Sequence, residues 1–153
     1  MSSLPPTLQE LDDALLRLRR LWLHPARRRR FLAELGEPVE LATLRTLRAI
    51  DLAGGEEPSV GDVAAALVID ASTASRLVDQ AVSGGYATRR PSQTDGRRSV
   101  LELTTAGADL LERSTKVRER LLAEVTTDWS TEDVATLTGL LERLHRDFER
   151  LDT

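Results

Sequence analysis

The most constraining feature of the chain is the segment from Ser59 to Thr104, because its helix and strand signals follow one another with almost no linker. The run Ser59-Val60-Gly61-Asp62 has the composition of a capped helix start, in which side-chain oxygens satisfy the first backbone N–H groups. The pair Gly84-Gly85 is a helix stop. Two strand-like runs follow and flank turn-forming material at residues 91–96. The segment therefore predicts two short helices and a two-stranded hairpin.

The boundary between the two short helices can also be read. The first has an apolar face that runs from Val60 to Leu67. Asp70 is a good N-cap for a second helix from Ala71 to about Ser83. Only residues 68–70 separate the two helices, so the pair has the form of a helix, a short turn and a helix.

The second helix has a slim polar face. At about 100° per residue, its core side collects small or medium apolar residues, namely Ala71, Ala74, Leu77, Val78, Ala81 and Val82. The opposite side is narrow enough to enter the major groove of DNA. Its N-terminal half carries the hydroxyl groups of Ser72, Thr73 and Ser75, which can contact phosphate oxygens. It also carries Arg76, which can reach a guanine edge or a phosphate. An ordinary amphipathic helix is the alternative interpretation of this pattern taken alone.

The hairpin carries an arginine-rich tip. Arg89, Arg90, Arg97 and Arg98 lie close together beside a single acid, Asp95. An arginine at the tip, such as Arg97, suits a narrow minor groove, where the negative potential is enhanced. Asp95 is expected to hold the Arg97 guanidinium through a charge-assisted hydrogen bond. A solvated hairpin whose exposed ion pair contributes little is the alternative.

Apolar stripes at helical spacing flank this segment on both sides. They predict helices at residues 8–23, 26–35, 41 to about 54, 105–127 and 131–150. Pro25 separates the first two helices, and Gly36 closes the second. Ser130 and Asp133 supply the start signal of the last helix. The stripes offer more apolar surface than one small domain can cover, which favours burial against a second chain.

Composition excludes several kinds of site. The chain of 153 residues has no cysteine, which excludes disulfides, thiolate metal sites and cysteine redox sensing and favours an intracellular location. There is no signal-peptide pattern and no apolar run long enough to span a membrane, so we expect a soluble, cytoplasmic protein with no membrane partner. His24 and His145 stand apart from other metal ligands, and no nucleophile with a base or phosphate loop occurs. We therefore expect no metal, no cofactor and no enzymatic activity.

The net charge of −4 does not argue against DNA binding, because the acidic excess lies beyond residue 104. Arginines dominate residues 89–98, which makes a local electropositive lobe. A mildly acidic protein with one basic tip can still bind DNA.

These motifs together resemble the winged helix-turn-helix of the multiple-antibiotic-resistance regulator (MarR) family. The resemblance covers the string PSVGDVAAALVIDASTASRLVDQAVSGGYATRRPSQTDGRRSVLELTTAGADLL, and the order of the flanking helices extends it to roughly residues 8–150. It is carried by STASRLVD, GGYATRRP, the Asp95-x-Arg97 pair and the LTTAG of residues 103–107. It implies a mainly α (α+β) fold: a winged helix-turn-helix domain at residues 37–104 (helix-turn-helix 59–84, wing 86–104) and dimerisation helices at 1–36 and 105–153.

The resemblance also implies a function. It implies a homodimer that binds double-stranded DNA at a pseudo-palindromic operator and usually represses transcription. Positions that contact or organise DNA in the family map onto Ser72, Thr73, Ser75, Arg76, Asp95, Arg97 and Arg98, the last as a phosphate contact. Members often release DNA on binding an anionic aromatic compound or another small-molecule effector. Candidate effector contacts, chosen because aromatic and imidazole groups are scarce here, are Trp22, His24, Tyr86 and Trp129; each is also compatible with packing or a surface position.

Two questions stay open at the level of sequence. A winged-helix module that binds another protein instead of DNA is the main alternative function, and the salt dependence of DNA binding separates the two. The run from Arg27 to Arg30 either adds phosphate contacts or is a solvated face paired with acids such as Glu34.

Overall fold

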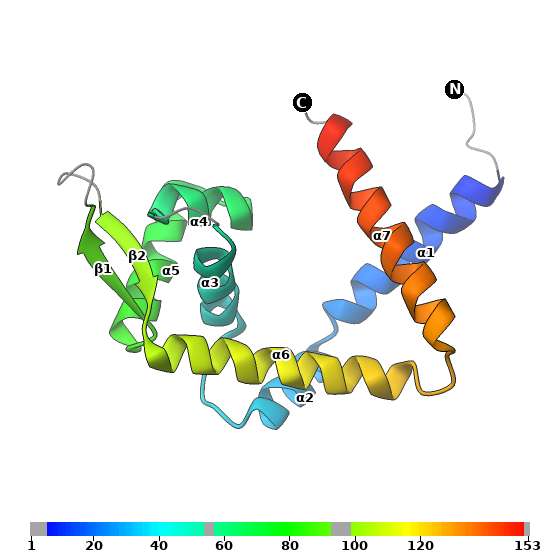
Figure 1. The fold of residues 1–153 in the computed structure, drawn as a ribbon, viewed down its shortest axis with the longest axis horizontal. Helices are drawn as coiled ribbons and strands as arrows, with labels where there is room; N and C mark the ends of the chain where they lie inside the picture. Colours follow the sequence, from blue (N-terminus) through cyan, green and yellow to red (C-terminus); the bar gives the residue numbers. More distant parts are fainter. Residues whose placement is uncertain (1–5, 54–56, 93–98, 152–153) are drawn as a thin grey trace. The chain divides into compact units, whose positions relative to one another are not determined.

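The structure, a computed structural model, describes residues 6–53, 57–92 and 99–151. Residues 1–117 form one compact unit and residues 118–153 another. Along the chain the elements (Figure 1) are α1 Pro6–Trp22, α2 Pro25–Leu35, α3 Leu41–Leu52, α4 Val60–Leu67, α5 Ala71–Ser83, β1 Ala87–Pro91, β2 Ser99–Leu103, α6 Thr105–Val125 and α7 Thr131–Leu151. This mainly helical fold with one small sheet confirms the expected class. Within the described ranges, no helix is both long enough and apolar enough to cross a membrane.

The N-terminal helices α1 and α2 begin and end close to the predicted positions. Pro25 is the first residue of α2, where its missing N–H costs nothing. His24 caps this helix, because its Nδ1 atom accepts a hydrogen bond from the Ala26 N–H at 3.2 Å. Gly36 ends α2 in the left-handed region with a φ of 70°. His24 thus has a structural role that the sequence did not reveal.

The core of the first unit lies between α3, α4, α5 and the hairpin. One side chain from each helix, Leu47, Val63 and Val78, has no exposed surface. Burying an apolar side chain of this size stabilises the fold by about 1.5–3 kcal/mol. The predicted core face of α5 is confirmed at Ala74 and Ala81, which are also fully buried. It is wrong at Ala71, which is exposed because the first turn of α5 projects into solvent.

Side-chain caps fix the starts of α4 and α5, as predicted. The Ser59 N–H donates to the Asp62 carboxylate at 2.8 Å, and the Asp62 N–H donates to Ser59 Oγ at 3.3 Å, which completes a capping box. Asp70 caps α5 by accepting from the Thr73 N–H at 2.8 Å. The caps set the length of the turn between the helices, and so the position of the polar face of α5.

Val68, in this turn, has an unusual backbone conformation. Its φ of 54° and ψ of 52° lie in the left-handed region, which residues with a branched Cβ rarely adopt. The conformation lets the Val68 and Ile69 N–H groups donate to the Ala65 and Ala64 carbonyl oxygens at 3.2 and 3.1 Å. The Val68 side chain is 90% exposed, so packing does not offset the backbone strain.

The two strands form the antiparallel hairpin that the sequence predicts. Ala87 pairs with Leu103 and Arg89 with Leu101. Ala87 and Leu101 are buried, so this face of the hairpin packs on the core, where β1 contacts α5 and β2 contacts α3. The Leu101 N–H also donates to the Pro58 carbonyl oxygen at 2.7 Å, which ties β2 to the segment before α4. The turn was predicted at residues 91–96, but Pro91 is the last residue of β1, and residues 93–96 lie outside the described residues.

Thr104 and Gly107 join the hairpin to α6. The Thr104 hydroxyl donates to the Gly85 carbonyl oxygen at 2.7 Å and accepts from the Gly107 N–H at 3.0 Å. The Thr104 N–H donates to the Tyr86 carbonyl oxygen at 3.0 Å. Gly107 lies so close to this carbonyl that a Cβ atom would overlap it. The LTTAG motif thus joins the wing to α6 through the hydrogen bonds of the Thr104 hydroxyl and the close backbone contact that Gly107 allows.

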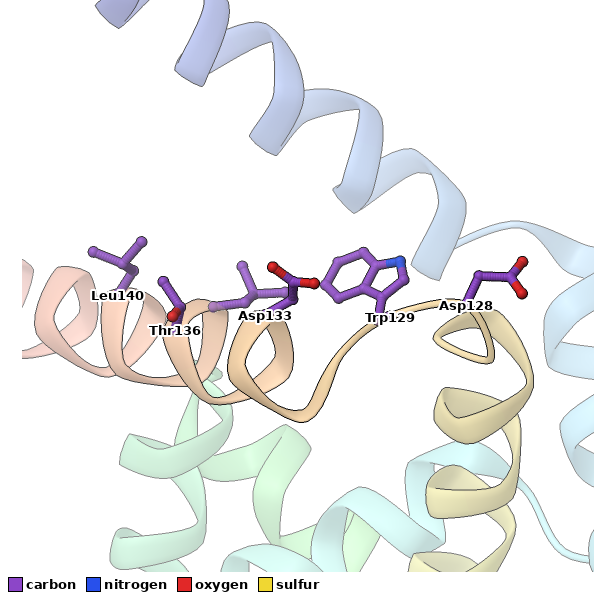
Figure 2. A pocket seen from close by; sticks show the side chains of 6 residues that line it. Asp128, Trp129, Asp133, Thr136 and Leu140 are labelled. Carbon is purple, nitrogen blue, oxygen red and sulfur yellow. The ribbon is translucent and has the colours of Figure 1, made fainter.

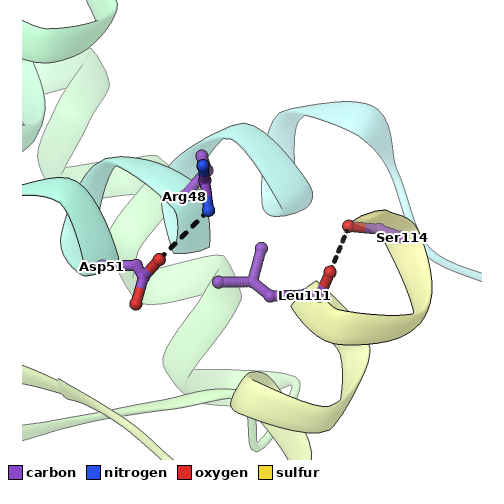
Figure 3. Close-up of polar contacts among 4 residues, drawn as sticks. All are labelled: Arg48, Asp51, Leu111 and Ser114. Atoms are coloured by element: carbon purple, nitrogen blue, oxygen red, sulfur yellow. Dashed lines mark hydrogen bonds and ion pairs between the residues drawn. The ribbon is translucent and has the colours of Figure 1, made fainter. Parts of the chain in front are cut away.

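The first half of α6 is anchored against the core by apolar side chains. Figure 3 shows Leu111 pointing from α6 toward α3, beside the exposed Arg48–Asp51 ion pair of 3.2 Å. Ser114 is fully buried on α6, and its hydroxyl donates to the Leu111 carbonyl oxygen at 2.8 Å. The buried hydroxyl is therefore satisfied within the helix.

The second unit is dominated by α7. Ser130 and Asp133 form the predicted capping box at its start, with the Asp133 N–H donating to Ser130 Oγ at 3.0 Å. Although all 21 residues of α7 are described, none of them is buried. Its apolar stripe is between 40% and 56% exposed at Val134, Leu137, Leu141 and Phe148. This unit therefore has no core of its own on that side of the helix.

Candidate nucleic-acid interface

The polar face of α5 brings together four of the residues predicted to contact DNA. Ser72 and Arg76 are exposed, whereas Thr73 and Ser75 are partly buried. All four lie in the first two turns, directly after the N-cap Asp70. The three predicted wing residues, Asp95, Arg97 and Arg98, lie outside the described residues, so their roles stay predictions.

Asp70 organises the hydroxyl groups of the first turn, although the sequence indicated only a cap at this position. The Ser72 hydroxyl donates to Asp70 Oδ1 at 2.5 Å, and the Thr73 hydroxyl donates to Oδ2 at 2.7 Å. The hydrogen bonds from the Ser72 and Thr73 hydroxyls, and then from the Thr73 N–H, hold the pKa of Asp70 well below its ordinary value. An N-cap aspartate with serine two and threonine three positions later is a sequence signal that could have revealed this cluster.

The cluster changes the chemistry that this turn can offer. A hydroxyl has one proton, and the protons of both Ser72 and Thr73 are already donated to Asp70. The hydroxyl oxygens therefore present lone pairs to solvent and can accept hydrogen bonds. An acceptor suits the amino group of adenine or cytosine in the major groove, whereas a phosphate oxygen needs a donor. In this arrangement the two hydroxyls are better placed to contact base edges than the phosphates expected from the sequence.

Arg76 is an exposed cation on the same face of α5 as Ser72, four residues away. Among the described residues, its guanidinium makes no hydrogen bond or ion pair. It therefore remains available for a guanine edge or a phosphate.

The base of the wing is fixed to α5 by an ion pair that the sequence did not predict. Arg89 of β1 donates from Nη2 to Asp79 Oδ1 of α5 at 2.8 Å. Its neighbour Arg90 instead pairs with Glu102 across the hairpin. Strand alternation places consecutive residues on opposite faces, which explains why the two adjacent arginines have different partners. Both ion pairs are partly exposed.

A second polar link holds the far end of β1. Ser92 is 7% exposed, and its hydroxyl donates to the Glu57 carboxylate at 2.5 Å. Glu57 immediately precedes Pro58, which accepts from Leu101 of β2. The end of β1 and the middle of β2 are thus both tied to the segment that precedes α4.

The four candidate effector contacts have different surroundings. Trp22 is 60% exposed at the end of α1, and His24 caps α2. The Tyr86 ring lies against Gly84, where an added Cβ would be 3.0 Å from two ring carbons. His24 and Tyr86 thus have structural contacts within the chain, and their roles as effector contacts stay predictions. In the described part of the chain, no group of three or more His, Asp or Glu side chains is arranged to hold a metal ion.

Trp129 lines an open pocket of about 370 Å³ in the second unit, with Asp128, Asp133, Thr136, Leu137 and Leu140 (Figure 2). The Trp129 indole stands between the two carboxylates in this view. The pocket combines an aromatic face with acidic groups, so its chemistry does not favour the anionic compounds that the family resemblance implied.

Two helices joined by a short turn and followed by a hairpin that packs on the second helix define a winged helix-turn-helix protein. Residues 38–98 match the model of the MarR family. Over these residues, which make up less than half of the chain, the protein is similar to the MarR family.

Two curated relatives are also similar to part of the chain. The HTH-type transcriptional regulator YdgJ of Bacillus subtilis is 28% identical over 97 residues, which is 63% of this chain and 59% of that protein. The multiple antibiotic resistance protein MarR of Escherichia coli is 33% identical over 79 residues, 51% of this chain and 55% of that protein. The match thus spans less than two thirds of the length of either curated relative.

Solved structures share the fold over most of the chain. A MarR family protein from Bacillus stearothermophilus superposes with a TM-score of 0.79 at 23% identity, covering 97% of this chain and 99% of that one. A mutant of Staphylococcus aureus MepR bound to an oligodeoxyribonucleotide has a TM-score of 0.60 at 20% identity, covering 89% of this chain and 96% of that one. At these identities the likeness shows the fold.

Proposed function

We propose that the chain is a sequence-specific, DNA-binding transcriptional regulator that acts as a homodimer. The observation that carries the proposal is the polar face of α5, where Ser72 and Arg76 are exposed beside the partly buried Thr73 and the helix is tied to the wing by the Arg89–Asp79 ion pair. The match of residues 38–98 to the MarR family model and the DNA-bound MepR structure of the same fold support this use of the face.

In the proposed complex, the first turns of α5 enter the major groove. Ser72 and Thr73 accept from base amino groups, and Arg76 reaches a guanine edge or a phosphate. The wing tip places Arg97 in the adjacent minor groove, oriented by Asp95, while Arg98 contacts a phosphate. Two copies of α5 in successive major grooves require half-sites about one helical turn, roughly 10 base pairs, apart. The operator is therefore expected to be pseudo-palindromic.

A second copy of the chain is the proposed partner of the exposed apolar stripes. On α1, the stripe is between 44% and 46% exposed at Leu8, Leu11, Leu18 and Leu21. The stripe of α7 is equally uncovered, and no residue of that helix is buried. Removing apolar surface from water stabilises by about 25 cal/mol per Å², so covering both stripes supplies a driving force for dimerisation.

Repression and release by a small-molecule effector complete the proposal. Of the four candidate effector contacts, Trp129 lines a described pocket, and its neighbours Asp128 and Asp133 favour a cationic or neutral compound over an anion. A regulator that binds chromosomal DNA in this way acts in the cytoplasm.

Fluorescence anisotropy on a duplex from the region upstream of the gene, titrated at several salt concentrations, tests the proposal. We expect tight binding that weakens steeply with salt, because phosphate contacts release counterions. A random duplex is the control for sequence preference. Arg97→Ala should weaken binding by about 1–3 kcal/mol, the size of one good DNA contact.

The alternative function, a module that binds another protein, gives a different result. It predicts no preference for any duplex in a binding-site selection over the whole genome, and it predicts capture of a protein whose affinity changes little with salt. That outcome would reject the DNA-binding proposal.

A further inference from the structure

We propose that Arg89 is a positioning residue for DNA recognition: by holding the Asp79 carboxylate, it keeps the Arg76 guanidinium free to contact DNA. The inference rests on the proposed function, and it concerns an arginine of the wing base that has no direct contact with DNA in that proposal.

Arg76 and Asp79 are natural partners on α5. They are three residues apart, so they lie side by side on the helix surface, with Cβ atoms about 5–6 Å apart. The same residue types at the same spacing and in the same order do pair elsewhere in this chain, because Arg48 and Asp51 of α3 form an ion pair of 3.2 Å. Arg150 and Asp147 of α7 pair at 3.2 Å in the reverse order.

The expected pair between Arg76 and Asp79 is nevertheless absent. Asp79 Oδ1 accepts from Arg89 at 2.8 Å, and the Arg76 side chain has no polar partner among the residues that the structure describes. Asp79 therefore pairs with Arg89 of β1 and not with Arg76, its neighbour on α5.

The location of Arg89 explains why it prevails. Arg89 lies on the core side of the hairpin, directly opposite the buried Leu101, and its side chain is only 32% exposed. The packed wing base already restricts its rotamers, so less entropy is lost on pairing, and water screens the contact less. The exposed Arg76 would have to be ordered from solvent to make the same bond.

The arrangement matters because Asp79 lies on the polar face of α5, seven residues after Ser72. Without Arg89, the Asp79 carboxylate would pair with Arg76. That ion pair would then have to break before the Arg76 guanidinium could contact DNA. Once Arg76 had moved to the DNA, Asp79 would also present an uncompensated negative charge to the DNA phosphates. Arg89 removes both effects and leaves Arg76 available to DNA.

The first test needs no DNA. NMR relaxation of the arginine Nε–Hε groups reports how mobile each guanidinium is on the picosecond-to-nanosecond timescale. We expect an ordered Arg89 and a mobile Arg76 in the wild type, an ordered Arg76 in Arg89→Ala, and a mobile Arg76 again in the double variant Arg89→Ala/Asp79→Asn. An Arg76 that stays equally mobile in Arg89→Ala would overturn the proposal.

The second test measures operator affinity. Arg89→Ala should weaken binding by about two- to fivefold, the range expected for one partly exposed charge pair. Arg89→Lys should remain near the wild type because it can still hold Asp79. Asp79→Asn should keep wild-type affinity or exceed it, and adding it to Arg89→Ala should restore most of the loss, because no carboxylate is left to capture Arg76.

A purely structural link between wing and helix makes the opposite prediction for Asp79→Asn. It predicts that Asp79→Asn weakens binding as much as Arg89→Ala and rescues nothing, and this result would reject the inference. Arg90→Ala, which removes a neighbouring arginine that pairs with Glu102 instead, is the matched control for loss of one positive charge; its defect should not be rescued by Asp79→Asn. Thermal melting of each variant checks that it folds.

If the wild type binds no operator, the proposed function fails and takes with it any role of Arg89 in recognition. The relaxation experiment still decides separately whether Arg89 controls the mobility of Arg76.

Discussion

The backbone carbonyl of Tyr86 occupies the space in which a Cβ atom of residue 107 would stand, so Gly107 is the point at which α6 crosses the end of the hairpin. Glycine is required here for close approach, since its φ is not in the left-handed region.

Gly107→Ala should therefore destabilise the protein. The added methyl group meets a backbone carbonyl that is also held by the Thr104 N–H, so neither side can move easily. We expect a loss of about 2–3 kcal/mol, as for other overpacking substitutions, measured by urea unfolding. Gly139→Ala in α7 is the matched control, because nothing lies within 4 Å of the position that its methyl group would take; it should gain about 0.5–1 kcal/mol. Equal effects of the two substitutions would contradict the packing argument.

Val68→Gly should stabilise the protein. The left-handed conformation costs an L residue about 1–2 kcal/mol, and the 90% exposed side chain loses almost no contacts when removed. Glycine adds entropy to the unfolded chain, which offsets about 0.5–1 kcal/mol of the gain. The expected net gain is about 0.5–1 kcal/mol in urea unfolding. Val68→Ala, which keeps Cβ, should gain less; if it gains as much as the glycine variant, backbone strain is not the cause.

Asp70→Asn should flatten the pH dependence of stability in acid. The pKa of Asp70 is lowered in the folded state by the Ser72 and Thr73 hydrogen bonds, so its contribution is fully present above the ordinary aspartate pKa of about 3.9. It is lost as the pH falls from that value toward the lower pKa of the folded state. Urea midpoints of wild type and variant should therefore converge below about pH 4. A constant difference between them at every pH would show that Asp70 acts only as a cap.

Leu141→Glu should disrupt the proposed dimer. Leu141 lies in the exposed apolar stripe of α7, where a carboxylate costs nothing in the free subunit but is desolvated in an interface. We expect the sedimentation coefficient at micromolar concentration to fall to that of a monomer. Ala135→Glu places the same charge about 120° around α7 from Leu141, outside the apolar stripe, and should leave the dimer intact. A wild type that is already monomeric under these conditions would refute the dimer itself.

Local signals in the sequence predicted most of the elements. Asp70 and Ser59 located the starts of α5 and α4 because capping depends on residues within one turn. The hairpin followed from two strand-like runs that flank turn-forming residues. Ala71 was wrongly predicted to be buried, because a helical wheel does not show which turns of a helix extend beyond the elements it packs against.

The parts of the site that depend on tertiary packing could not be predicted in the same way. Arg89 and Asp79 are ten residues apart and belong to different elements, so only the packing of β1 on α5 brings them together. The sequence likewise singled out Gly107 within a motif but did not show that the Tyr86 carbonyl lies against it. The sequence identified the Ser72 and Thr73 hydroxyls as candidate DNA contacts. It did not show that both donate to Asp70, which determines the hydrogen bonds that they can still make.

The lack of any buried residue on α7 also bears on how much of this protein must be present before it can work. A helix without a core is marginal by itself, so in the proposed dimer its order depends on a second copy, and stability becomes dependent on protein concentration. Dilution would then separate the subunits and loosen them at the same time. A regulator built in this way responds steeply to its own abundance, because scarce subunits lose structure as well as their partners.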